Sequence, residues 1–195
     1  QRLVGVAELG RSWMVTDRGS SGTQVEDQSI ELKAMTRTRE AVGERGHVSA
    51  TSYNRTLLLT GEVAADTDKV AVEQAVAKIE GVRTIVNELV VAGSSSLAAR
   101  SNDAILTSKV KASFIDAKDV FANAIKVVTE RGTVYLMGRV TEREANRASD
   151  IARGVSGVQK VVRVFEVITE AELADLQPKQ GQTQSQAQPQ PQPKP

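Results

Sequence analysis

The sequence repeats itself with a period of about 76 residues, and this repeat limits the fold more than any other feature. Two stretches on either side of a Gly/Ser-rich GSSS segment show the same order of helix-like and strand-like patterns. Gly61 lies 77 positions before Gly138, and Gly81 lies 76 positions before Gly157. Because self-similarity at a fixed period is typical of duplicated units, the sequence predicts two copies of one small module in tandem.

Each copy is expected to run helix, strand, strand, helix, strand. In the first copy we expect these elements at 27–41, 47–53, 56–63, 67–79 and 84–91. In the second copy we expect them at 103–117, 124–130, 133–140, 142–155 and 160–168. The strands alternate apolar and polar residues, and the helices repeat apolar residues about every four positions. The fold class is therefore α+β, with a three-stranded mixed sheet and two helices packed on one face of it.

The chain divides into five segments by composition and pattern. We expect an extended N-terminal arm over 1–26, the first copy over 27–93, a linker over 94–101, the second copy over 102–170 and a Gln/Pro-rich disordered tail over 171–195. The tail has too few apolar side chains to offset the entropy of ordering the chain.

The turns and glycines of the two copies can be compared position by position. Arg131-Gly132 suits a tight hairpin because glycine readily adopts positive φ, whereas Asn54-Arg55 suits such a turn less well. Gly61 and Gly138 each interrupt an apolar strand, where we expect a bulge or a close approach of a helix.

Composition excludes several classes of function. The sequence has no cysteine, which excludes structural disulfides and thiolate metal sites, and its one histidine, His47, excludes a multi-histidine metal site. No apolar run is long enough to span a membrane, and a net charge of +1 gives no strong attraction to nucleic acid. We predict no metal site and no cofactor.

The titratable residues do not suggest an active site. The pairs Asp66/Asp68 and Glu142/Glu144 fall at predicted helix starts, where carboxylates cap backbone N–H groups and suit the helix dipole. His47 precedes a predicted strand and has no evident serine or cysteine partner, so it is interpreted as a surface or turn residue. The chain is therefore predicted not to be an enzyme.

Two strands carry a resemblance to a known domain. LLLTGEV at 57–63 and VYLMGRV at 134–140 are each followed by a helical run, a Gly-Val pair and a Val-rich strand. This pattern resembles the BON domain, an α-β-β-α-β unit. The resemblance implies that the chain holds two BON domains in tandem.

The tandem arrangement resembles the DolP/YraP family of dual-BON outer-membrane lipoproteins. GTQVED at 22–27 opens the first copy and SND at 101–103 opens the second, as in that family. The runs at 134–145 and 150–161 are especially similar, and the resemblance covers about 17–169.

The family resemblance implies a location and a function. Its members lie in the periplasm, anchored to the inner leaflet of the outer membrane through an N-terminal cysteine, and support envelope integrity without known catalytic activity. They bind anionic phospholipid mainly through the first helix of the second BON domain. The implied partners are an anionic phospholipid surface and the outer-membrane assembly machinery, with the chain a monomer. Because this sequence begins at Gln1 and has no cysteine, we expect the anchor cysteine to precede it.

The predicted helix 103–117 is the candidate lipid-binding element. Ile105 lies about 100° away from its core stripe, with Lys109 and Ala112 on the same face and Lys111 nearby. An exposed apolar side chain beside lysines is typical of an interfacial helix. The predicted lipid-binding residues are Ile105, Leu106, Lys109, Lys111 and Ala112. The alternative is an ordinary amphipathic helix with a solvated basic side, and some family members carry an aromatic residue in place of Ile105.

Charge distinguishes the two copies. Residues 28–93 hold eight basic and nine acidic residues, a net charge of −1, whereas 101–169 hold eleven and eight, a net charge of +3. If one copy meets an anionic surface, we expect it to be the second.

A second function stays open from the sequence. The chain could be a soluble periplasmic module that binds proteins under stress or acts like a chaperone, through its sheet faces or its tail. A cysteine just before Gln1 would favour the lipoprotein, and a plain signal-peptidase site would favour the soluble module.

Overall fold

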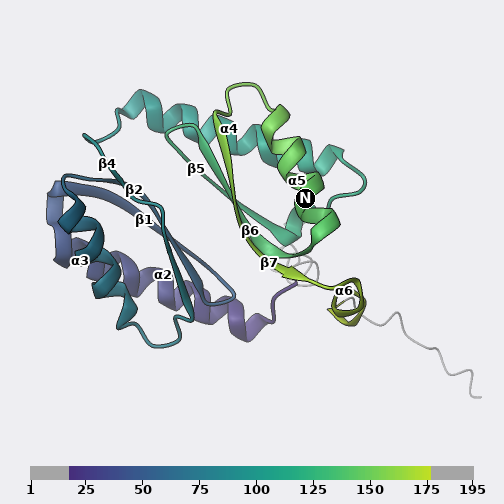
Figure 1. The fold of residues 1–195 in the computed structure, drawn as a ribbon, viewed down its shortest axis with the longest axis horizontal. Helices are drawn as coiled ribbons and strands as arrows, with labels where there is room; N and C mark the ends of the chain where they lie inside the picture. The colour runs from purple at the N-terminus through teal and green to yellow at the C-terminus, as the bar shows by residue number, and fades with distance from the viewer. Residues whose placement is uncertain (1–17, 177–195) are drawn as a thin grey trace, which may run out of the picture.

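The computed structural model describes residues 18–176, which form two similar α/β units that face each other through their sheets (Figure 1). The first copy contains α2 (Ser21–Val42), η1 (Gly43–Arg45), β1 (Gly46–Tyr53), β2 (Thr56–Val63), α3 (Asp66–Ala77), β3 (Thr84–Asn87) and β4 (Val90–Val91). The second copy contains α4 (Leu97–Asp116), η2 (Ala122–Ala124), β5 (Ile125–Glu130), β6 (Thr133–Thr141), α5 (Glu142–Gly154) and β7 (Lys160–Ile168), and α6 (Glu170–Leu176) follows it.

Both sheets have the predicted mixed topology. The strand order is β1-β2-β3 in the first copy and β5-β6-β7 in the second, with an antiparallel first pair and a parallel second pair. In the first copy the last strand is interrupted, so that β3 and β4 pair separately with β2. At the interruption the Asn87 side chain accepts the N–H of Leu89 at 3.2 Å, and Leu89 is buried in the core. The predicted α+β fold is confirmed.

Each copy has its own aliphatic core between its sheet and its two helices. The first core consists of Ile30, Ala34, Val42, Leu57, Leu59, Val63, Val72, Val76, Ile79 and Leu89. The second consists of Val110, Phe114, Val120, Ile125, Val127, Val134, Leu136, Val140, Ala145, Ala148 and Ala152. The inward residues of the first helix in each copy are therefore core residues, as their spacing predicts.

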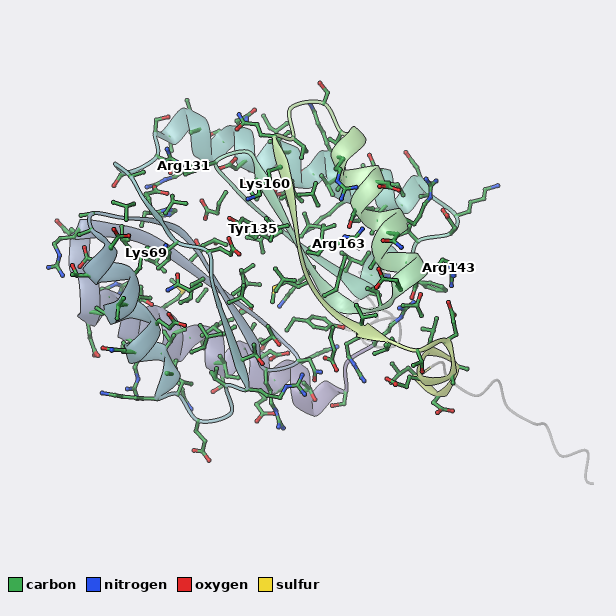
Figure 2. The ribbon with its side chains drawn as sticks, viewed as in Figure 1. Lys69, Arg131, Tyr135, Arg143, Lys160 and Arg163 are labelled. Atoms are coloured by element: carbon green, nitrogen blue, oxygen red, sulfur yellow. The ribbon has the colours of Figure 1, made fainter. Side chains whose placement is uncertain are left out.

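A third apolar cluster joins the two sheets. Its buried members are Tyr53, Leu58, Tyr135 and Met137, and four partly buried valines surround them. Figure 2 shows Tyr135 in the space between the sheets. The molecule thus has four layers, with α2 and α3 outside one sheet and α4 and α5 outside the other (Figure 1).

The two hairpin turns share one backbone conformation. Both residues of the Asn54–Arg55 turn and both residues of the Arg131–Gly132 turn have positive φ, between 46° and 77°. The first copy therefore builds the tight turn although its residues are less suited to it.

A buried aspartate on the first helix of each copy holds this turn in place. Asp27 accepts the two backbone N–H groups of the Asn54–Arg55 turn at 2.7 and 2.8 Å. Asp103 accepts the two N–H groups of the Arg131–Gly132 turn, both at 2.9 Å. Because each carboxylate satisfies two turn N–H groups, it fixes the helix against the hairpin.

Gly61 and Gly138 allow two strands to approach closely. Their φ angles are 113° and 154°, and a Cβ would lie 2.0 Å from the carbonyl oxygen of His47 or 2.3 Å from that of Ala124. The backbone does approach closely, but the neighbour is β1 at Gly61 and the last residue of η2 at Gly138, so the expected approach of one of the two packing helices is wrong. No side chain fits at either position.

Three segment boundaries differ from the prediction. Residues 21–26 are helical and not extended, 97–101 belong to α4 and not to a linker, and 170–176 form α6. Ser20 and Ser96 are the reason for the two early helix starts, because each hydroxyl accepts the backbone N–H three positions on, at 3.1 Å.

The predictions for the chain before residue 18 and for the tail after residue 176 lie outside the described residues. Within residues 18–176, none of the helices has both the length and the apolar content to cross a bilayer.

Candidate functional site

The structure places the predicted lipid-binding residues on two different faces of α4. Ile105, Lys109, Lys111 and Ala112 are exposed, and the side chain of Ile105 keeps 53% of its surface in solvent. Leu106 is only 1% exposed, belongs to the buried stripe of the helix and packs close to Gly157. The prediction of Leu106 as a lipid contact is therefore wrong, since its side chain is part of the protein interior.

The outward face of α4 is more apolar than the sequence analysis recognised. Leu97 and Ile115 are exposed by 81% and 73% and, at about 100° per residue, lie on the side of the helix opposite its core stripe. We call the outward surface of this helix the α4 face; it consists of Leu97, Ser101, Ala104, Ile105, Ser108, Ala112 and Ile115, with Asp116 near the Lys109 edge. Lys109 and Lys111 lie on its two opposite edges. A narrow apolar face between two lysines is the arrangement of an interfacial helix.

The loop after α4 also exposes an apolar side chain beside a lysine. Phe121 is exposed, and so is Lys118 three residues before it. The guanidinium of Arg18 lies 5.2 Å from the centre of the Phe121 ring, within the range of a cation–π contact. An exposed aromatic ring, Phe121, and an exposed lysine, Lys118, therefore lie beside the C-terminal end of α4.

The lysines at this face are available for a ligand. Among the described residues, Lys109, Lys111 and Lys118 have no ion-pair partner within 4.0 Å. Most acidic residues of the second copy are already in ion pairs: Asp119, Glu142, Glu144, Asp150 and Glu166. Asp116 is the one exposed carboxylate of 102–169 left without a cation among the residues that the structure describes. The field near α4 is therefore positive.

Arg18 ties the segment before α2 to the second copy. Its guanidinium donates to both carboxylate oxygens of Glu144, at 2.8 and 2.7 Å, and to the carbonyl oxygen of Arg139 at 3.0 Å. Burial alone would raise the pKa of Glu144, but the hydrogen bonds from Arg18 and Thr141 and the charge of Arg18 lower it below its ordinary value. The contact holds the chain that leads to α2 against the start of α5.

The two carboxylate pairs at helix starts differ in what they do. Glu144 forms a capping box with Thr141 at the start of α5, as predicted for this pair. Asp66 and Asp68 lie in the first turn of α3, where no side chain caps the helix, and Asp68 instead pairs with Arg45 at 3.4 Å. The capping prediction is therefore confirmed for α5 and wrong for α3.

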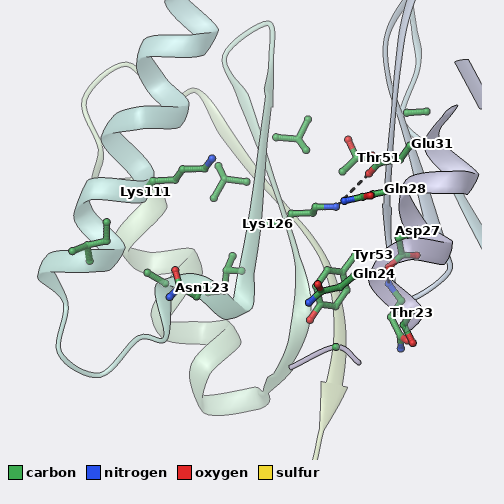
Figure 3. A pocket seen from close by; sticks show the side chains of 18 residues that line it. Thr23, Gln24, Asp27, Gln28, Glu31, Thr51, Tyr53, Lys111, Asn123 and Lys126 are labelled. Atoms are coloured by element: carbon green, nitrogen blue, oxygen red, sulfur yellow. Dashed lines mark hydrogen bonds and ion pairs between the residues drawn. The ribbon is translucent and has the colours of Figure 1, made fainter. Parts of the chain in front are cut away.

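A cleft of about 620 Å³ separates the two copies beside α4 (Figure 3). One wall comes from α2 and β1, and the other from the end of α4 and from β5, with Lys111 and Ile115 among its lining residues. Lys126 crosses the cleft and donates to the carbonyl oxygen of Ser52 at 2.8 Å and to Glu31 at 3.3 Å. Hydroxyl, amide and aliphatic groups line most of the rest, which suits binding more than proton transfer.

A comparison with known protein families identifies the repeated unit. A model of the BON domain matches residues 27–93 and 102–169, once for each copy. The chain belongs to the BON-domain family. It is 40% identical over 159 residues to the outer membrane lipoprotein DolP of Haemophilus influenzae, covering 80% of this chain and 81% of that protein. It is 30% identical over 154 residues to a 21 kDa hemolysin of Actinobacillus pleuropneumoniae, covering 78% and 79%.

These relatives confirm the predicted dual-BON outer-membrane lipoprotein family and the location at the outer membrane. Solved structures of CdsD, a structural protein of the type III secretion system of Chlamydia trachomatis, are more distant. One is 13% identical with a TM-score of 0.30 and covers 73% of this chain and 96% of that structure. Another, of the C-terminal domain, is 11% identical with a TM-score of 0.29 and covers 69% and 97%. Both scores are low, and the fold assignment rests on the strand topology.

Proposed function

We propose that this BON protein is a non-catalytic periplasmic lipoprotein that binds anionic phospholipid through the α4 face and so supports the integrity of the outer membrane. The observation that carries the proposal is the outward surface of α4. There, Ile105 and Ile115 are exposed between two lysines, Lys109 and Lys111, that no described residue neutralises.

The physical basis is the two-part nature of the membrane interface. Apolar side chains of an interfacial helix enter the boundary between headgroups and acyl chains, while ammonium groups remain at the phosphates. Each lysine near an anionic surface contributes on the order of 1 kcal/mol, so two or three lysines give weak binding that salt screens. Such binding suffices for a protein that a lipid already holds at the surface, which is what the name of the Haemophilus relative says of that protein.

The absence of catalysis is part of the proposal, and its support comes from what the carboxylates do. Asp27 and Asp103 are committed to hairpin turns, and Glu144 is committed to Arg18 and to the helix cap. These roles are structural, and they commit all three carboxylates to holding the fold, which is not the role of a general acid or base.

A second candidate function has its own observation. β1 and β5 are edge strands, and both line the cleft between the copies. An edge strand presents unpaired backbone groups that an extended peptide can bind. Peptide binding in this cleft would correspond to the protein-interaction or chaperone-like module.

The test is an NMR titration of the full chain with two kinds of lipid vesicle. Vesicles containing phosphatidylglycerol are expected to shift or broaden the backbone signals of Ile105, Lys109 and Ile115, and added salt should weaken the effect. Vesicles of phosphatidylcholine alone should leave these signals in place. Shifts confined to the first copy, or equal shifts with both lipids, would contradict the proposal.

A further inference from the structure

Three potential metal ligands from both copies meet at one end of the gap between the sheets. His47 on β1 and Glu62 on β2 are direct cross-strand partners, so their side chains share one face of the sheet. Leu58, on the same face of β2, packs in the cluster between the sheets, which places this face toward the second copy. Glu130 at the end of β5 supplies the third group, and one ligand atom of each residue lies within 4.8 Å of the others.

Two buried atoms of this cluster lack a hydrogen-bond partner among the described residues. Glu62 is 1% exposed; its Oε1 accepts the N–H and the hydroxyl of Ser95 at 2.6 and 2.8 Å, whereas its Oε2 has no hydrogen bond. The Nδ1 of His47 is likewise buried and unbonded. The guanidinium of Arg131 is 4.0 Å from Oε2, too far for a hydrogen bond. Buried polar atoms are normally satisfied, so this pair points to a missing partner.

The electrostatics of the cluster favour an added cation. Burial raises the pKa of Glu130, and the negative charge of Glu62 raises it further, while a hydrogen bond from Ser49 and the charge of Arg100 act in the opposite direction. Two carboxylates that disfavour each other's charge in a partly buried place are stabilised by a positive ion between them.

We propose that His47, Glu62 and Glu130 bind a divalent transition-metal ion, best matched by Zn²⁺, and that this ion joins the two BON domains. An imidazole nitrogen disfavours Mg²⁺ and Ca²⁺, which take oxygen ligands, and suits Zn²⁺. Zinc–ligand bonds of about 2.0–2.2 Å place tetrahedral ligand atoms roughly 3.4 Å apart. Nδ1 of His47 lies 3.6 Å from Oε1 of Glu62, so small side-chain movements bring the unbonded Oε2 of the same carboxylate to an ion at Nδ1. Three protein ligands leave the fourth position to water.

The site requires both copies, because two ligands come from the first sheet and one comes from the second. Binding of the ion therefore stabilises the packed arrangement of the sheets relative to a separated one. Zinc at about 100 times its Kd is expected to raise the melting temperature by about 5 °C or more.

The experiment uses the full chain without a histidine tag, after removal of metal by a chelator. His47 is the only histidine in the sequence, so the imidazole signals in a ¹H–¹³C NMR spectrum report on this one residue. Zn²⁺ is expected to move these signals saturably at fixed pH and to raise the melting temperature, with Mg²⁺ at the same concentration doing neither. Imidazole signals that respond to pH but not to Zn²⁺ would overturn the proposal, because the cluster would then hold only a proton.

Matched variants locate the ion. Glu130→Gln and His47→Gln are each expected to abolish the rise in melting temperature. Glu166→Gln is the control, because Glu166 lies at the opposite end of the same interface, near Arg83 and Arg139, and the zinc response should persist there. A zinc response in Glu130→Gln equal to that of the wild type would place the ion elsewhere and overturn the proposal.

Discussion

The first helices of the two copies, α2 and α4, are alike on the inside and different on the outside. On the inner side, each helix carries a buried aspartate, Asp27 or Asp103, that holds the hairpin. Each helix also buries three side chains spaced four residues apart. Outward, both expose apolar side chains; on α2 these are Val25, Leu32 and Met35. Exposed apolar residues alone therefore do not distinguish a lipid-binding helix.

The charges around the two helices are what distinguishes the proposed lipid-binding helix, α4, from α2. In the first copy Glu40, Glu44, Asp66 and Glu80 are exposed and have no ion-pair partner among the described residues. In the second copy five of the eight acidic residues are paired, and the lysines beside the α4 face are not. Duplication has kept the framework of the unit and changed its surface. Four changes to the chain test this comparison.

The largest loss of stability is expected at the strand glycine that both copies require, Gly61 in the first and Gly138 in the second. Gly61→Ala and Gly138→Ala would each place a Cβ against a backbone carbonyl oxygen at strongly positive φ. Each should lower the free energy of unfolding by about 3 kcal/mol or more, measured by denaturant titration. Gly154→Ala in α5 is the control, since a Cβ there meets no atom within 4 Å. A loss at only one of the two strand glycines would show that the framework is not shared.

The second-largest loss of stability is expected when the aspartates that hold the hairpins are replaced. Asp103→Ala leaves two turn N–H groups without their acceptor and is expected to cost about 2 kcal/mol. Asp27→Ala should cost more, because Asp27 also accepts the hydroxyl of Ser52 at 2.8 Å and supports a turn in which both residues at positive φ are non-glycine. Chemical denaturation of both variants checks the order, and equal or reversed losses would contradict it.

The Arg18 contact exists only in the second copy, and its loss should have a smaller effect that depends on pH. Arg18→Ala is expected to cost about 1.5 kcal/mol at neutral pH. Because the folded pKa of Glu144 is lowered, the stabilisation is present above the unfolded pKa and is lost as pH falls through the folded pKa. The difference in melting temperature between wild type and Arg18→Ala should therefore shrink in acid. Arg143→Ala, which removes an exposed pair with Glu170, is the control and should have little effect at any pH.

The sequence predicted those parts of the fold that depend on local periodicity. The strands at 56–63 and 160–168 were placed to the residue, because each is a run rich in aliphatic residues bounded by turn residues. The starts of α2 and α4 were missed because the apolar period begins later than the serine caps. Ser96 had been interpreted as linker, which also concealed the exposed Leu97.

The candidate sites depend on tertiary contacts, so they could be predicted from the sequence only in part. Ile105 was placed on the outside correctly, whereas Leu106 was assigned to the lipid surface and is buried in the structure. His47 was interpreted as a surface or turn residue. Its cross-strand partner Glu62 follows from the register of the hairpin, but Glu130, from the other copy, reaches it only when the sheets pack face to face. Pairing within a sheet can be inferred from register, but packing between two sheets cannot.

The most direct test of the unequal surfaces is binding of the full chain to anionic vesicles after matched charge removal. Lys109→Gln with Lys111→Gln should weaken co-sedimentation with phosphatidylglycerol vesicles about thirtyfold, while Lys33→Gln with Arg39→Gln on α2 should leave it nearly unchanged. All four side chains are exposed, so folding should not be affected. Equal loss in both double variants, or loss only in the α2 variant, would contradict a lipid-binding role for the second copy.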